Sequence, residues 1–133
     1  MPDLEYARMM LRMAGKDSRA LESMLDENLF DQEIFGFHAE QAVEKGVKSW
    51  LNLVDIEYPK IHDLEKLFAL LKEARQNVPD EFRKLMDLSD FAVQFRYEAF
   101  EVSDLPFSRK NVLRDVKAFL AYVEILLQSA ENK

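Results

Sequence analysis

Apolar residues in this chain recur three and four positions apart, and this spacing constrains the fold more than any other feature of the sequence. A first helix is expected from about Asp3 to Leu25 and a second from about Asp31 to Val54, with a third beginning after a cap at Asp63. The apolar stripe of the first comprises Leu4, Ala7, Leu11, Ala14, Ser18, Leu21 and Leu25, and that of the third Leu64, Leu67, Phe68 and Leu71.

Two further helical segments complete the pattern. One begins near Asn77, as its N-cap, with Pro79 close to its first turn. The other begins at Ser108. Their apolar residues are Phe82, Leu85, Leu88, Phe91, Ala92 and Phe95 in the one, and Val112, Val116, Phe119, Leu120, Val123 and Leu127 in the other. Since no segment alternates as a strand does, the sequence predicts an all-α, antiparallel up-and-down bundle of about five helices, forming one domain over residues 1–133.

Composition excludes several classes of site. Without cysteines, the chain has no disulfides, thiolate metal ligands or cysteine nucleophiles. The two histidines, His38 and His62, lack the glutamate three residues earlier that a di-metal helical bundle requires. We therefore predict no metal and no cofactor. No apolar run approaches the ~18 residues of a membrane helix, so a cytoplasmic protein without membrane contact is expected.

The formal net charge of −7 argues against broad affinity for nucleic acids, because such binding depends largely on basic patches that displace counterions. A net negative charge does not exclude a local basic groove. Any nucleotide or RNA site should therefore be a small cluster of cations rather than a whole face of the molecule.

The stretch FHAEQAVEKGVKSWL in the second helix carries such a cluster. At about 100° per residue, one narrow stripe along the helix contains His38, Gln41, Lys45 and Lys48. The stripe has three interpretations. It is the solvated side of an amphipathic helix, with Glu44 and Lys48 as an i,i+4 ion pair, or a set of donors for a phosphate or nucleotide, or an interface with a partner.

Small residues lie beside this stripe on the apolar side of the same helix. Ala39, Ala42 and Gly46 form a ridge that would let another helix approach closely. Glycine inside a helix costs about 1 kcal/mol of propensity relative to alanine, and a close contact at Gly46 would explain why the residue is glycine.

Three motifs resemble those of the HEPN domains (higher eukaryotes and prokaryotes nucleotide-binding). They are Gln41-x-x-Glu44-Lys45-x-x-Lys48 in the second helix, His62-Asp63-Leu64 at the start of the third, and Arg96-Tyr97 before the last. The resemblance runs from the second helix to the chain end, and the long leading helix also fits it.

The resemblance implies a helical bundle that commonly forms a homodimer. It also implies partnership with a minimal nucleotidyltransferase in a toxin–antitoxin cassette, or the binding of a nucleotide or RNA. Many members of the family are metal-independent ribonucleases with an arginine and a histidine about four to six residues apart. This chain has no histidine after Arg96 and no arginine in the corresponding windows before His38 or His62. We therefore carry over no catalytic residue and no ribonuclease activity.

The binding residues of the family are carried over position by position. Lys45 and Lys48 would contact phosphate, Arg96 would form a bidentate phosphate contact, and Gln41 would read a base or order the stripe. His38 and His62 would hydrogen-bond or stack.

Two alternatives stay open. One is a ribonuclease toxin whose site folding rearranges, with Arg96 beside His62. The other is a module that only binds other proteins.

Overall fold

The computed structural model describes residues 2–90 and 108–133, and these form helices joined by loops. The long helices are α1 (Leu4–Ser23), α2 (Gln32–Leu53) and α5 (Arg109–Glu131). The shorter elements are α3 (Leu64–Glu73) and the 3₁₀ helix η1 (Asp80–Leu88). No strand occurs in the described ranges, which confirms the predicted all-α bundle. Within the same ranges, no helix combines the length and apolar character needed to cross a membrane.

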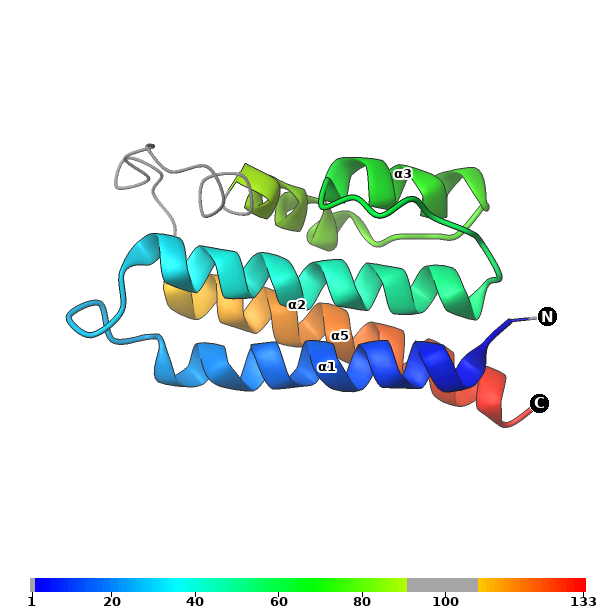
Figure 1. The fold of residues 1–133 in the computed structure, drawn as a ribbon, viewed down its shortest axis with the longest axis horizontal. Coiled ribbons are helices and arrows are strands. Elements are labelled where there is room, and N and C mark those ends of the chain that lie inside the picture. Colours follow the sequence, from blue (N-terminus) through cyan, green and yellow to red (C-terminus); the bar gives the residue numbers. More distant parts are fainter. Residues whose placement is uncertain (1, 91–107) are drawn as a thin grey trace.

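Helix α2 is the centre of the bundle (Figure 1). It packs against α1, against α5 behind it in the view, and against α3 and η1 above it. Helices α2 and α5 run in the same direction, opposite to α1. The loop 54–63 returns along the bundle, so α3 also runs in the direction of α2. As a result, His62 before α3 contacts Glu44 in the middle of α2, while Gln76 after α3 contacts Trp50 near the end of α2.

Side-chain caps fix three helix starts. Asp3 accepts a hydrogen bond from the backbone N–H of Tyr6 at 2.9 Å, and Asp63 accepts one from Lys66 at 3.3 Å. The hydroxyl of Ser108 accepts one from the N–H of Asn111 at 3.3 Å. Each satisfies an N–H that the helix itself leaves without an acceptor. The predicted starts of α1, α3 and α5 are therefore confirmed, and each is explained by a side-chain cap.

The fourth helical segment differs from the prediction in type and in cap. It begins at Asp80 with Pro79 at the cap position, so Asn77 is not the cap, and it is a 3₁₀ helix. Its buried residues, Phe82, Leu85 and Leu88, are the predicted ones. They recur every three residues, which matches the 3.0 residues per turn of a 3₁₀ helix better than the 3.6 of an α-helix. The remaining predicted core residues of this segment, Phe91, Ala92 and Phe95, lie outside the described residues.

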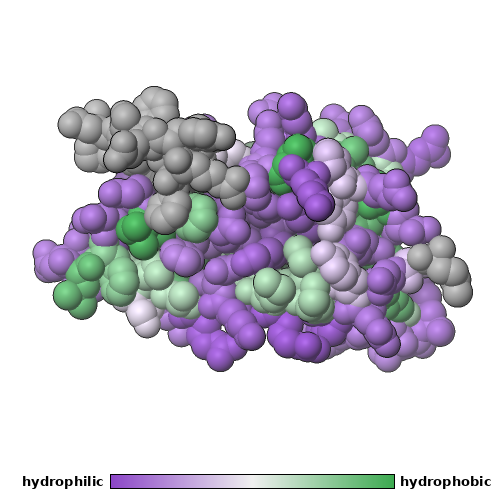
Figure 2. Space-filling view, in the orientation of Figure 1, coloured by the Kyte–Doolittle hydropathy of each residue, from purple (hydrophilic) through white to green (hydrophobic). Residues whose placement is uncertain are grey.

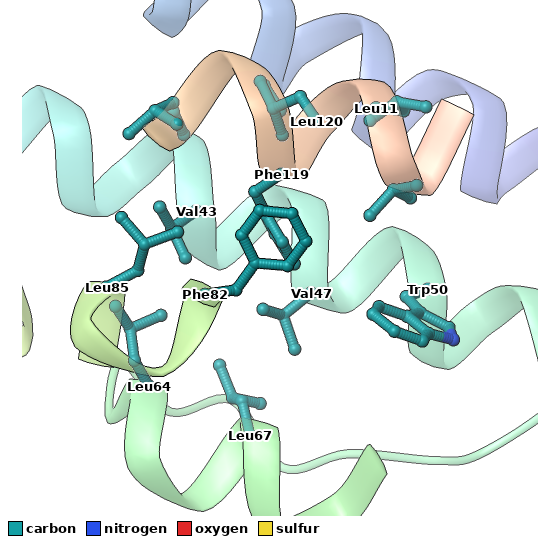
Figure 3. Close-up of a cluster of buried hydrophobic side chains, with 14 of the residues drawn as sticks. Leu11, Val43, Val47, Trp50, Leu64, Leu67, Phe82, Leu85, Phe119 and Leu120 are labelled. Atoms are coloured by element: carbon teal, nitrogen blue, oxygen red, sulfur yellow. The ribbon is translucent and has the colours of Figure 1, made fainter. Parts of the chain in front are cut away.

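In the core, an aromatic cluster joins α2, α3, η1 and α5 (Figure 3). Phe119 is fully buried, and its ring centroid lies 5.3 Å from that of Phe82, 5.7 Å from that of Phe68 and 6.4 Å from that of Trp50. Trp50 is 1% exposed and its indole N–H donates to Gln76 Oε1 at 3.0 Å. Four elements therefore share one set of ring contacts.

Gly46 lies in close contact with α5, as the small-residue ridge predicts. A β-carbon at this position would lie 2.7 Å from Leu120 Cδ2 and 2.9 Å from Phe119 Cε2. Phe119 is enclosed by the aromatic cluster and has little room to shift. Gly15 in α1, by contrast, would present its β-carbon to open space.

Alanine at these two glycines should therefore change stability in opposite directions. Gly15→Ala should raise the free energy of unfolding by about 0.5–1 kcal/mol through helix propensity. Gly46→Ala gains the same propensity but overpacks the α2–α5 contact, at a cost of about 1–3 kcal/mol, and should be destabilising on balance. Urea unfolding followed by the fluorescence of Trp50 measures both, and an increase in stability for Gly46→Ala would contradict the close contact.

Candidate functional site

A buried carboxylate, Glu44, is the centre of the polar edge of α2. Its side chain is 5% exposed, and Oε1 accepts a hydrogen bond from Lys48 Nζ at 2.7 Å. The ring Nδ1 of His62 lies 3.0 Å from both carboxylate oxygens. Gln41 Nε2 lies at the limit of hydrogen bonding, 3.5 Å from Oε2. Glu44 therefore gathers side chains from α2 and from the loop before α3 into one cluster, called the Glu44 cluster below: Glu44, Gln41, Lys48 and His62.

The geometry fixes which nitrogen of His62 faces the carboxylate. An ionised carboxylate has no hydrogen to donate, so Nδ1 must carry the hydrogen and donate to Glu44. The other nitrogen, Nε2, is then the one left for a ligand, and the His62 side chain is 41% exposed. In its neutral form this nitrogen is an acceptor, and in the imidazolium form it is a donor.

Lys48 is held from two sides. Besides the ion pair with Glu44, its ammonium lies 5.8 Å from the centroid of the Tyr58 ring, within the range of a cation–π contact. Tyr58 is fixed in turn, since its hydroxyl accepts a hydrogen bond from Asn52 Nδ2 at 3.1 Å. The Lys48 side chain is 13% exposed, so its ammonium is ordered near the surface.

The pKa of Glu44 lies below its ordinary value of 4.5. Burial raises this pKa, but hydrogen bonds with Glu40, Lys48 and His62 together outweigh the burial. Glu40 is fully buried too, and it accepts a hydrogen bond from Gln41 Nε2 at 2.8 Å.

This pKa predicts a pH dependence of stability. Since Glu44 binds its proton less readily in the folded protein than in the unfolded chain, its stabilisation is complete above about pH 4.5 and is lost as the pH falls through the folded pKa. The difference in unfolding free energy between the wild type and Glu44→Gln should therefore shrink as the pH falls below 4.5. Urea unfolding at a series of pH values tests this, and a difference that is constant or grows towards low pH would contradict the assignment.

A second polar cluster lies where α1 meets α2. Asp17 of α1 forms an ion pair with Lys45, and His38 Nδ1 lies 3.5 Å from its other oxygen. The side chains of Lys45 and His38 are 22% and 33% exposed. Asp17 therefore orders the half of the α2 stripe that faces α1.

The structure thus divides the six residues predicted for the site. Gln41, Lys48 and His62 come together around Glu44, while His38 and Lys45 lie beside Asp17. Arg96 lies outside the described residues. The predicted Glu44–Lys48 ion pair is confirmed, and so is the cap at Asp63.

Sequence reasoning missed that Glu40 and Glu44 are buried. A signal was available in the helical wheel of α2. Leu51 lies at about 220° from His38, between Glu40 at about 200° and Glu44 at about 240°. Leu51 is fully buried, so the two glutamates lie on a covered face of the helix. The apolar arc of α2 therefore extends further round the helix than its small residues alone indicate.

In the described part of the chain, no three histidine, aspartate or glutamate side chains are grouped as metal ligands are. The Glu44 cluster pairs its carboxylate with cations and an amide. Such an arrangement can orient donors towards an anion, and it can move a proton at His62 Nε2.

A comparison with protein families matches the HEPN domain over residues 7–133, nearly the whole chain. No curated protein and no solved structure gives a match. The match covers α2 and the loop before α3, which together carry the Glu44 cluster. The chain belongs to the HEPN domain family, a family of helical modules related to nucleotides and RNA.

Proposed function

We propose that the Glu44 cluster binds the phosphate group of a nucleotide. Lys48 and His62 are the cationic contacts, and Gln41 is a hydrogen-bonding group at their side. The observation that carries the proposal is that one buried carboxylate accepts hydrogen bonds from both Lys48 and His62. These two side chains come from separate elements and are ordered next to each other at the surface before any ligand arrives.

The arrangement raises the affinity for a ligand because it holds the Lys48 side chain in place before the ligand binds. A free lysine side chain loses about 1.5–2 kcal/mol of rotamer freedom when it is fixed, whereas Lys48 is already held by Glu44 and by the Tyr58 ring. An ammonium group has three donors, and Glu44 accepts one of them. The remaining donors of Lys48 are then available for phosphate oxygens, and so is the Nε2–H of His62 when its ring is the imidazolium ion.

Charge sets the conditions under which the site binds. Lys48 and Glu44 compensate each other, so the cluster gains a net positive charge when His62 is the imidazolium ion. Binding of a phosphate should therefore be stronger when His62 is protonated. We propose binding without catalysis, because the arginine and histidine that family nucleases use do not occur at their spacing in this sequence.

A calorimetric titration with ATP, GTP and AMP tests the proposal. The wild type should bind at least one of them at millimolar concentration or below, and Lys48→Ala should weaken this binding about tenfold, or 1.4 kcal/mol. Lys110→Ala, which removes the same charge from an exposed position in α5, is the control and should bind as the wild type does. No heat with any of the three ligands, or equal binding by Lys48→Ala, would contradict the proposal.

The homodimer and the partnership with a minimal nucleotidyltransferase stay predictions that rest on family membership. Static light scattering tests the dimer, and the gene next to this one tests the cassette. A strict monomer would count against any site shared between two copies.

A further inference from the structure

The outward face of α1 carries a row of exposed apolar side chains that the bundle does not use. Tyr6 is 43% exposed, Met9 37% and Met13 40%. Their spacing of three and four residues places them on one line along the helix. In Figure 2, apolar residues lie over α1 on the visible face, bordered by hydrophilic ones. The inward residues of α1, such as Ala7 and Ala14, are fully buried, so the helix has one face in the core and another apolar line in solvent.

A row of cations runs directly beside this apolar line. Arg12, Lys16 and Arg19 are exposed and lie four and three residues apart, again on one line. Among residues 2–90 and 108–133, none of the three has a carboxylate within 4.0 Å. Arg8 on the same helix differs from them, because it pairs with Glu124 and Glu131. The row is therefore a local positive stripe on a chain whose net charge is −7.

We propose that these two rows, together the α1 face, dock an acidic amphipathic helix of another protein. The apolar row would receive the apolar side of the partner helix, and methionine suits such a contact because its unbranched thioether side chain adapts to varied shapes. The cationic row would pair with aspartate or glutamate along one flank of the partner.

The charges select this occupant over two others. A second copy that packed antiparallel on the α1 face through a two-fold axis would bring the cationic row against the same row, and like charges oppose that contact. A nucleic acid would engage the cations but leave the methionines without a partner, since bases stack on aromatic rings and the face has one, Tyr6. An acidic helix engages both rows.

The α1 face is distinct from the Glu44 cluster, so the inference goes beyond nucleotide binding. Its residues all lie on α1, whereas the Glu44 cluster combines α2 with the loop before α3. Each site can therefore be tested without altering the other.

The test uses two synthetic peptides of about 20 residues, long enough to form an amphipathic helix. Both have leucines at helical spacing. One has glutamates on the flanks, and the other has lysines in their place. We expect the glutamate peptide to bind the wild type at least about tenfold more tightly than the lysine peptide, as measured by fluorescence polarisation.

Matched variants locate the site. Arg12→Glu/Lys16→Glu/Arg19→Glu should weaken binding of the glutamate peptide about tenfold or more, whereas Lys66→Glu/Lys72→Glu/Lys110→Glu, with the same change of charge at exposed positions elsewhere, should change it less than about twofold. Met9→Ser/Met13→Ser should also weaken binding, and Met9→Leu/Met13→Leu should retain it. Both double methionine variants leave the charge of the protein unchanged and alter only exposed side chains. They therefore still report on docking if the charge reversal disturbs the fold.

Three results would overturn the inference. The first is equal affinity for the two peptides. The second is full peptide binding by the α1 charge variant. The third is binding of a single-stranded RNA that this variant abolishes while the glutamate peptide does not bind, which would assign the face to nucleic acid. The α1 charge variant should bind nucleotides as the wild type does. A failure of the docking inference therefore does not count against nucleotide binding by the Glu44 cluster.

Discussion

Replacing Phe119 with alanine should lower the free energy of unfolding by about 3–5 kcal/mol, the usual cost of removing a buried phenylalanine. The reason lies in its position. The ring is fully buried and contacts Phe82 of η1, Phe68 of α3 and Trp50 of α2, so its loss leaves a cavity that four elements line. Domains of this size are stable by about 5–15 kcal/mol, and the variant should therefore be close to unfolding.

Ile125→Ala is the matched control for this experiment. Ile125 lies on the same helix, but it is 66% exposed, and its truncation should change stability by no more than about 0.5 kcal/mol. Urea denaturation followed by fluorescence measures both variants. Trp50, the only tryptophan of the chain, lies against Phe119 and reports on the cluster directly. A loss below about 1 kcal/mol for Phe119→Ala would contradict the packing described here.

Glu44→Leu should lower the unfolding free energy by about 2–3 kcal/mol, below the 3–5 kcal/mol of a fully buried ion pair. The substitution leaves the Lys48 ammonium, on a side chain that is 13% exposed, without its counterion, and His62 without its acceptor. The cost is at the lower end because Lys48 is close enough to the surface to turn towards water. Urea unfolding at neutral pH measures the loss.

Glu44→Leu/Lys48→Leu should recover most of that stability, because an apolar pair replaces an ion pair with little net change. The double variant therefore separates the two roles of the cluster. If Glu44 and Lys48 only stabilise the fold, the double variant should bind nucleotides as the wild type does. If the double variant is as unstable as Glu44→Leu, the ion pair does not account for the destabilisation.

Much of the bundle follows from local rules. The spacing of apolar residues in α1, α3 and α5 predicts their buried faces, and Asp63 and Ser108 predict where helices start, because each depends on residues within one or two turns. The close contact at Gly46 is also visible in the sequence as a ridge of small residues. The 3₁₀ geometry of η1 was not predicted. Its buried residues Phe82, Leu85 and Leu88 recur every three residues, which favours a 3₁₀ helix, but so short a run also fits one face of an α-helix.

The candidate site was predictable only in part. Gln41 and Lys48 share a stripe by helical period, so their proximity is local. The contact of His62 with Glu44 depends on the loop 54–63 returning to the middle of α2, and no local rule gives that path. The pairing of Lys45 and His38 with Asp17 depends in the same way on how α1 packs on α2.

Calorimetric titration of ATP into the wild type and into Glu44→Leu/Lys48→Leu tests the central claim most directly. The claim is that the Glu44 cluster is a binding site and not only an ion pair within the fold. We predict that the double variant, folded and nearly as stable as the wild type, binds ATP at least about tenfold more weakly. Equal affinity of the two proteins for ATP would contradict the claim and leave the cluster with a structural role alone.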